Sequence, residues 1–428
     1  MDWVLFTIGA VLALLTVPAF VPVNQWALLV PAFVVSWIGT GLASYWLVVT
    51  PIALTVPVLL GGLDGWPGWV GLGLGLLALG ALLWERALAR RACAAYDRAL
   101  TALDARTVGR PRRSPASVFA PFWMGSRRVE RVRDVRYADG AKRRHLLDVY
   151  RPRPEPTAPA PVLLQIHGGG WIVGSKGTQG RPLMQTLTSS GWVCVAINYR
   201  LAPRGRIHDQ IVDCKLALRW IREHIAEYGG DPDRVVVTGG SAGGHLSSLV
   251  ALTANDPRYQ PDFESVDTSV IGCVPMYGAY DLEELFTDRT PLGRRFCDLV
   301  GERVVGVSAT DDPGAYRALS PMFTIRPGAP PFLVVHGTVD NLIPVEQARR
   351  LVAALREVGT DVTYVELAGA PHAFDVFHSE WADAAVAGTA RWLAWLLSRD
   401  ADAAAPTTDG AASTGPTTTA RTEPSSAR

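Results

Sequence analysis

The first 84 residues are almost free of charge, and this feature constrains the fold of the chain more than any other. No charged residue lies between Trp3 and Leu63, and after Asp64 a second uncharged run extends to Trp84. A bilayer core needs about 20 apolar residues per helix. The composition therefore predicts a transmembrane helical region over residues 1–84 with three or four spans. The candidate spans are residues 3–22, 26–44, 45–62 and 67–84.

A cleaved signal peptide is not expected here. Met1 and Asp2 offer no positive region, and the apolar material continues far past any cleavage site. A soluble helical bundle is the alternative, but such a bundle would be expected to show polar faces. The lipid bilayer is thus the first predicted partner of the chain.

Residues 85–127 are predicted to form a basic juxtamembrane helix and linker. Apolar residues recur at a helical spacing from Leu88 to Leu103 and are surrounded by arginines, and a linker follows at 109–115. No short connection before residue 84 contains Lys or Arg, whereas eight arginines follow within about 30 residues. Because positive charge is usually kept inside, the sequence predicts a multi-pass membrane protein with the rest of the chain in the cytoplasm.

The remaining composition excludes several classes of function. The formal net charge is +1, so nothing indicates binding to nucleic acid. The five cysteines are scattered without C-x-x-C spacing, so we expect neither a disulfide framework nor a zinc site. Residues 399–428 contain no aromatic residue and are predicted to form a disordered tail.

Residues 128–398 are predicted to form one α/β domain, because strand-like apolar runs alternate with longer amphipathic stretches. This alternation predicts a mostly parallel sheet with helices on both faces. The predicted parallel strands are 162–166, 192–197, 235–238, 270–275, 332–335 and 362–366. The predicted helices are 207–227, 242–254, 345–358 and 379–397, and an antiparallel edge is expected at 130–137 and 145–150.

A glycine-rich turn joins one of these strands to the next helix. Ser241 lies between Gly239 and Gly243 in the pattern G-x-S-x-G, directly after a β-branched run. Glycines allow the strained backbone and close packing of a sharp strand-to-helix turn, and the hydroxyl then projects at a helix N-terminus. Ser241 is therefore the candidate nucleophile, and the N–H of Ala242 is a candidate donor to an oxyanion.

A second glycine run supplies further candidate donors. His167 and Gly168 follow a predicted strand and are continued by Gly169, Gly170 and a tryptophan. Three successive glycines let backbone N–H groups converge without side-chain obstruction. A tight loop or a phosphate cradle would have the same composition, but the serine turn downstream favours an oxyanion hole.

A serine nucleophile needs a base, and eight histidines are present. His372 lies in a loop after the last predicted strand, where an α/β sheet gathers its reactive groups. His378 is the runner-up. His245 lies one helical turn after Ser241 and is expected to point along the helix.

The acid should lie at a strand end between the serine and the histidine. Asp340 follows a buried strand and a glycine turn, and Glu366 and Asp375 are lesser candidates. The order serine, acid, histidine is that of α/β hydrolases.

Five ordered motifs carry a resemblance to a known family. HGGGW, NYRLAP, GGDPDRVVVTGGSAGGHL, HGTVDNLIP and PHAF together resemble the hormone-sensitive-lipase-like esterases of the α/β-hydrolase superfamily, of the membrane-anchored bacterial carboxylesterase type. The resemblance implies an α/β-hydrolase fold preceded by the helical transmembrane region. It also implies that Gly169, Gly170 and Ala242 form the oxyanion hole. Gly240 departs from the family, which often has Asp there, so formamidase-like and feruloyl-esterase-like branches stay open.

These observations predict a membrane-anchored serine ester hydrolase with the catalytic residues Ser241, Asp340 and His372. The expected substrate is a small-molecule or lipid ester, and no metal or organic cofactor is expected. An amidase or deacetylase would use the same residues, and a non-catalytic membrane sensor is a lesser alternative. The segment 278–330 is predicted to form a cap over the acyl pocket, or else an ordinary helical insertion.

Overall fold

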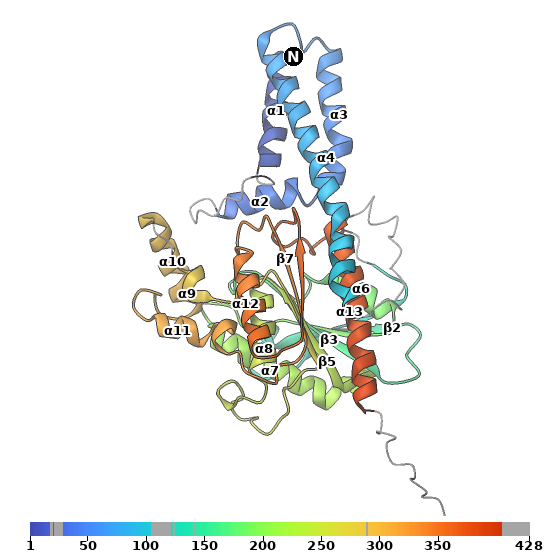
Figure 1. Ribbon diagram of the computed structural model, residues 1–428, viewed down its shortest axis with the longest axis vertical. Helices are drawn as coiled ribbons and strands as arrows, with labels where there is room; N and C mark the ends of the chain where they lie inside the picture. The colour runs from blue at the N-terminus through green and yellow to red at the C-terminus, as the bar shows by residue number, and fades with distance from the viewer. Residues whose placement is uncertain are drawn as a thin grey trace, which may run out of the picture.

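The computed structural model describes residues 1–17, 20, 29–103, 121–122, 125–140, 142–287 and 290–404. Figure 1 shows two parts, an α/β domain and a bundle of helices that projects from one end of it. Most of the predicted linker and the tail beyond residue 404 lie outside the described residues.

The α/β domain is built on an eight-stranded sheet of order β1-β2-β4-β3-β5-β6-β7-β8. β2 runs antiparallel to β1 and to β4, and the neighbours from β4 to β8 are parallel. The predicted mostly parallel sheet with an antiparallel edge is thus confirmed. The strands are β1 (Val129–Arg136), β2 (Leu146–Pro152), β3 (Ala160–Ile166), β4 (Val193–Ile197), β5 (Gly230–Gly240), β6 (Gly272–Met276), β7 (Phe332–Gly337) and β8 (Val362–Leu367).

Helices cover both faces of the sheet, because alternate residues of each parallel strand bury their apolar side chains on opposite sides. One core includes residues of α7 (Ile207–His224), α8 (Ala242–Leu252) and α12 (Glu346–Glu357). The other includes residues of α6 (Arg181–Ser189) and α13 (Glu380–Ala404). The sequence prediction missed α6. It also ended the last helix at residue 397, whereas α13 continues to Ala404, so the first residues of the predicted disordered tail are helical.

The insertion between β6 and β7 contains α9 (Leu282–Leu285), α10 (Pro291–Val304) and α11 (Pro313–Ala318). These helices lie together at one side of the domain (Figure 1). Phe286 packs between Trp171 and Tyr316, with ring centroids 6.2 and 5.6 Å away. The insertion therefore contacts the glycine loop that ends at Trp171.

The N-terminal region contains α1 (Asp2–Thr16), α2 (Leu29–Gly39), α3 (Ala43–Leu59) and α4 (Trp66–Thr101). Figure 1 shows α1, α3 and the first half of α4 side by side, with α2 lying across their base against the α/β domain. Within the described residues, α4 is the one helix long and apolar enough to cross a membrane, and the bent pair α2 and α3 adds a second only if it counts as one span.

The predicted second span, residues 26–44, contains α2, which ends at Gly39, and residues 26–28 lie outside the described part of the chain. α2 and α3 meet at an angle of 80°. A Cβ on Gly39 would overlap the carbonyl oxygen of Leu15, and a Cβ on Gly41 would overlap that of Trp37. These two glycines permit the close approach that the corner needs.

α4 joins the two parts of the molecule as one continuous helix of 36 residues. Beyond Trp84 its buried residues Ala92, Tyr96 and Leu100 belong to the same core as α6 and α13. The predicted continuation of the last apolar helix into an amphipathic stretch is correct, and its apolar stripe packs against the α/β domain.

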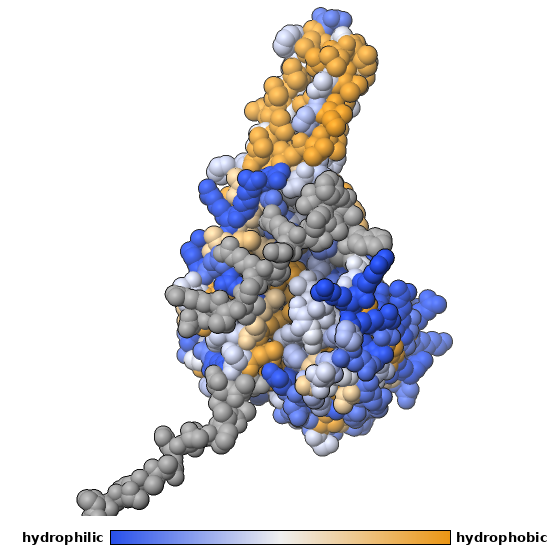
Figure 2. Space-filling model, turned by 90° about the vertical axis from the view of Figure 1, so that its right-hand side faces the viewer, coloured by the Kyte–Doolittle hydropathy of each residue, from blue (hydrophilic) through white to orange (hydrophobic). Residues whose placement is uncertain are grey.

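The two parts differ in their surfaces. Figure 2 shows apolar residues gathered on the projecting helices, whereas the surface of the α/β domain is mainly polar. Among the described residues, all but five of the exposed large apolar side chains belong to residues 1–84. A soluble bundle would bury such side chains or expose them singly.

Candidate active site

Ser241 lies on a sharp turn between β5 and α8, as the glycine pattern predicts. Its φ of 60° and ψ of −125° are strained for a residue with a Cβ. Its N–H donates to the carbonyl oxygen of Met276 at the end of β6, at 3.0 Å. The turn therefore holds the serine at the carboxyl edge of the sheet.

Two glycines of this turn let α8 approach β3. A Cβ on Gly243 would overlap the carbonyl oxygen of Ile166, and a Cβ on Gly239 would lie 2.5 Å from the same oxygen. Larger residues would push α8 and its N-terminus away from the sheet. A Cβ on Gly243 would also lie 2.9 Å from the carbonyl group of His167, so the N-terminus of α8, where Ala242 is buried, lies beside the loop that follows β3.

The glycine loop after β3 curls next to the serine. Gly169 and Gly170 have φ values of 120° and 57°, which favour glycine. A Cβ on Gly168 would lie 2.6 Å from the carbonyl oxygen of Gly240 and 3.1 Å from the Cβ of Ser241. The loop that carries the predicted oxyanion donors is thus in contact with the turn at Ser241.

Contacts between His167 and Tyr199 hold the start of this loop in place. Its ring is buried and stacks on Tyr199 with centroids 4.3 Å apart, and the Tyr199 hydroxyl donates to the carbonyl oxygen of His167 at 2.8 Å. Burial lowers the pKa of His167 to about 4, so the ring is neutral. Its place in the motif is structural.

Asp340 and His372 meet at the same edge of the sheet. Asp340 follows β7 and His372 follows β8, and Nδ1 of the histidine lies 2.7 Å from Oδ2 of the carboxylate. The other carboxylate oxygen accepts from the N–H groups of Leu342 and Ile343, both at 2.8 Å. Because Nδ1 faces the carboxylate, Nε2 is the nitrogen that is left for a reacting hydroxyl.

The electrostatics keep Asp340 ionised. Burial alone would raise the pKa of its carboxyl, but the charge of His372 and hydrogen bonds from His336 and His372 hold the pKa well below its usual range. A buried carboxylate is stable here because both its oxygens have partners.

The other candidate residues have different environments. His245 accepts from the indole N–H of Trp171 at 3.2 Å and is 2.8 Å from the carbonyl oxygen of Leu319, and burial lowers its pKa to about 4. His378 pairs weakly with Asp383 at 3.4 Å. Glu366 is bound by Arg349 at 2.7 Å. None of these contacts joins the pair formed by Asp340 and His372.

Asp375 takes part in a buried network that the sequence analysis did not find. The Tyr277 hydroxyl donates to Asp375 and accepts from Nε2 of Gln179 at 2.8 Å. Oε1 of Gln179 in turn accepts from the N–H of Gly168 at 2.5 Å. The network therefore runs from a position three residues after His372 to the glycine loop.

Tyr277 also explains why the residue before the serine is glycine. A Cβ on Gly240 would overlap the Tyr277 hydroxyl and lie 2.7 Å from Nε2 of Gln179. The Tyr277 ring packs edge-on against the ring of His372, with centroids 4.8 Å apart. The tyrosine thus occupies the space that a side chain at position 240 would need, and it links the serine turn to the histidine.

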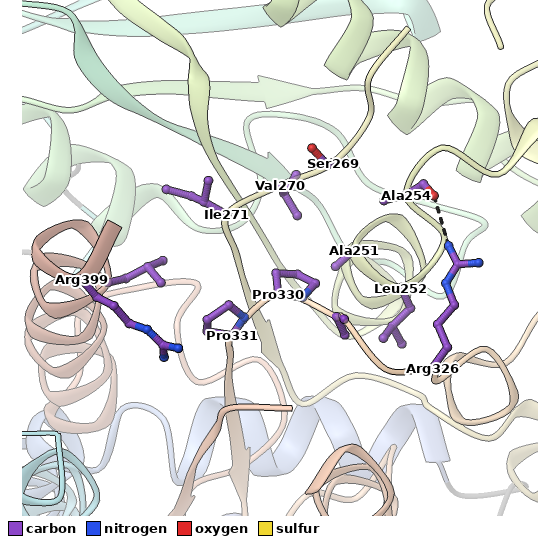
Figure 3. A pocket seen from close by; sticks show the side chains of 13 residues that line it. Ala251, Leu252, Ala254, Ser269, Val270, Ile271, Arg326, Pro330, Pro331 and Arg399 are labelled. Atoms are coloured by element: carbon purple, nitrogen blue, oxygen red, sulfur yellow. Dashed lines mark hydrogen bonds between the residues drawn. The ribbon is translucent and has the colours of Figure 1, made fainter. Parts of the chain in front are cut away.

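A cavity of about 360 Å³ lies at the opposite edge of the sheet. Figure 3 shows it near the amino ends of β6 and β7, where Ile271 and Pro331 line it. Arg326 donates from Nη2 to the carbonyl oxygen of Ala254 at 3.1 Å. The cavity contains none of the predicted catalytic residues. Among the described residues, no group of three or more His, Cys, Asp or Glu side chains could hold a metal ion.

The strand order and the turn at Ser241 define the class of this domain as an α/β hydrolase. Residues 147–355 match the family model described as BD-FAE. The chain is 48% identical over 247 residues to "Probable carboxylic ester hydrolase LipM" of Mycobacterium tuberculosis, covering 58% of this chain and 57% of the relative. It is 44% identical over 268 residues to "Esterase LipC" of the same organism, covering 62% of this chain and 64% of the relative.

Esterase B from Lactobacillus rhamnosis has the same fold, with a TM-score of 0.55 at 22% identity over 74% of this chain and 98% of that one. The resemblance predicted from the motifs is therefore confirmed: the domain has the α/β-hydrolase fold, and the relatives that it matches are named as a carboxylic ester hydrolase and an esterase. The matches span less than two thirds of the length of these curated relatives.

Proposed function

We propose that the chain is a membrane-anchored serine carboxylic ester hydrolase that acts through an acyl-enzyme on Ser241. The observation that carries this proposal is the 2.7 Å hydrogen bond between His372 and Asp340 at the sheet edge that also holds the strained serine. The names of the relatives support an ester as the substrate.

The proposed reaction has two halves. The Ser241 hydroxyl attacks the acyl carbonyl while Nε2 of His372 takes its proton, and the same proton passes to the leaving alcohol. Asp340 fixes the histidine tautomer and stabilises the imidazolium. Water then attacks the acyl-enzyme with the same proton transfers and releases the acid.

Backbone N–H groups would receive the oxyanion. Gly169, Gly170 and Ala242 belong to the two segments that touch at Ser241. Loss of one such donor typically costs on the order of 100-fold to 1,000-fold in rate. The network through Gln179 and Tyr277 would keep the glycine loop at this distance.

Membrane anchoring is supported by the surface of the helices. Trp66 and Trp84 are exposed at the two ends of the uncharged part of α4. At a rise of 1.5 Å per residue they are about 27 Å apart, close to the roughly 30 Å of a bilayer core. Tryptophan favours both membrane interfaces.

Orientation is proposed from charge. Arg86, Arg90, Arg91 and Arg98 follow Trp84 on α4, and a positive excess is usually kept in the cytoplasm. The α/β domain is therefore proposed to be cytoplasmic. Reporter fusions after residue 404, the end of α13, test this, and activity only from a reporter that requires export would contradict it.

The direct test of the activity uses a fluorophosphonate and a pair of substrates. The probe should form its adduct on Ser241, and a matched ester should be hydrolysed faster than its anilide. Faster cleavage of the anilide would favour an amidase or deacetylase. Absence of both labelling and turnover would favour a sensor without catalysis.

A further inference from the structure

Helix α2 packs directly on the loop that carries His372. The Phe33 ring lies edge-on to the His372 ring with centroids 5.9 Å apart. The Trp37 indole N–H donates to the carbonyl oxygen of Ala373 at 3.3 Å, and its ring lies 5.2 Å from that of Phe377. Figure 1 shows α2 lying across the end of the sheet that faces the bundle. α2 therefore covers the histidine side of the candidate active site.

The composition of α2 is unusual for a helix that covers a soluble domain. Its sequence, LVPAFVVSWIG, contains no charged residue. Phe33 and Trp37 are four residues apart and so share the face that meets the loop, while the Val34 side chain is 40% exposed. A covering helix in water would have a polar outer face. An apolar outer face is expected where the helix meets lipid.

The position of α2 along the bundle supports the same conclusion. The corner between α2 and α3 and the start of the charged part of α4 border one cavity of about 440 Å³. Thr40, Gly41 and Tyr45 line it from the corner, and Arg86 lines it from α4. Arg86 is two residues after Trp84, where the uncharged run ends. α2 thus lies at the end of the apolar part of the bundle.

We propose that α2 lies at the bilayer surface, and that the substrates are amphiphilic lipid esters taken from the bilayer that holds the bundle. This inference rests on the proposed ester hydrolysis and membrane anchoring. The ester group reaches Ser241 from the membrane side while the acyl chain stays in contact with lipid, α2 or both. Such entry avoids transfer of each CH₂ group of the chain into water, which is unfavourable.

The first experiment needs no variant. The full chain is reconstituted in phosphatidylcholine vesicles, and p-nitrophenyl palmitate is placed either in the same vesicles or in separate ones. We expect hydrolysis at least about 10-fold faster when enzyme and ester share a bilayer. Equal rates would overturn the inference. Soluble p-nitrophenyl butyrate is the reference substrate. If the palmitate rates are equal but butyrate is hydrolysed, only the inference about lipid esters fails and the proposed ester hydrolysis stands. If butyrate is not hydrolysed and Ser241 is not labelled, both proposals fail.

The second experiment tests α2 itself. Trp37→Ala removes the contacts with Ala373 and Phe377, and the ratio of palmitate to butyrate turnover should fall about 10-fold in the shared vesicles. Val34→Ala, on the exposed face of the same helix, is the matched control and should change the ratio less than twofold. Labelling of Ser241 by a fluorophosphonate reports whether each variant is folded. An unchanged ratio in a labelled Trp37→Ala chain would overturn the role of α2. If that variant does not fold, Phe33→Ala gives the same comparison.

Discussion

The α/β domain and the helical bundle both use glycine where backbones approach, but with different consequences. In the domain, Gly239 and Gly243 bring α8 against β3 and so place a hydroxyl at the sheet edge. In the bundle, a Cβ on Gly9 would overlap the carbonyl oxygen of Gly71, so these glycines bring α1 against α4. Small residues at helix contacts are typical of association in lipid, where burial of apolar surface gives no driving force. The first pair positions a reactive group, and the second serves packing.

The two regions also bury their apolar residues differently. Every residue of the central strands β4, β6 and β7 is buried, whereas Leu76 and Leu77 of α4 are 54% and 72% exposed. A substitution at the catalytic edge should therefore change turnover by orders of magnitude. A substitution in the helices should act through access or stability.

The largest effect is expected for the nucleophile and the base. Ser241→Ala and His372→Ala should each lower kcat by at least about 10⁴-fold, because removal of either group disables the whole catalytic set. Turnover of p-nitrophenyl butyrate measures this. His378→Ala, a histidine near the helical bundle, should retain activity within about twofold. An inactive His378→Ala chain would mean that His378, and not His372, is the base.

Asp340→Asn should lower kcat on the order of 10³-fold to 10⁴-fold, because the amide favours the wrong histidine tautomer. It should also change the pH dependence of stability. An unfolded Asp has a pKa of about 3.9, and in the fold the pKa of Asp340 is held lower. The ionised carboxylate therefore contributes its full stabilisation only above about pH 5, and this contribution is lost as the pH falls through the unfolded pKa toward the folded pKa.

The Tm difference between the unsubstituted chain and Asp340→Asn should thus shrink between pH 5 and pH 3. Thermal unfolding followed by circular dichroism gives both values. A difference that stays constant over this range would mean that the charge of Asp340 does not contribute to stability.

Tyr277→Phe should have an intermediate effect. The variant loses the hydroxyl that joins Asp375 to Gln179, so the N–H of Gly168 is held less firmly. We expect kcat to fall about 10-fold with little change in KM, because an oxyanion donor acts mainly in the transition state. Tyr259→Phe is the control, since its hydroxyl is 3.4 Å from its acceptor. A rise in KM at constant kcat would assign Tyr277 to substrate binding instead.

The sequence predicted the parts of the site that are encoded locally. Ser241 and the glycine loop lie on turns whose glycines can be read from neighbouring residues, and Asp340 and His372 follow β-strands. The choice of Asp340 and His372 as acid and base rested on their order in the chain, and the structure shows that the two side chains are in contact. The catalytic roles of all three stay predictions.

The parts that were missed depend on contacts distant in sequence. Nothing near Gly240 indicates that Tyr277, 37 residues later, occupies the space beside it. α6 is short, and its start at Arg181 followed by Pro182 is the only local signal. For α2, an uncharged composition gives no sign that the helix packs on the α/β domain. Only the contacts with His372 and Phe377 show this.

The smallest effect on turnover is expected for Tyr96→Ala. This variant also tests where the boundary between the two regions lies. Tyr96 lies on α4, but its ring is buried against Gly388 of α13, where a Cβ would overlap it. Truncation of a buried aromatic residue costs about 3–5 kcal/mol of unfolding free energy. Turnover at 25 °C should change less than about twofold, because the ring lies in the core that α4 shares with α6 and α13.

Arg98→Ala, on the exposed side of the same turn, is the control and should cost less than about 0.5 kcal/mol of unfolding free energy. Chemical denaturation of both variants measures the difference. Equal stability would mean that the second half of α4 belongs to the bundle, and the boundary between the two regions would then move from Trp84 to the end of the helix.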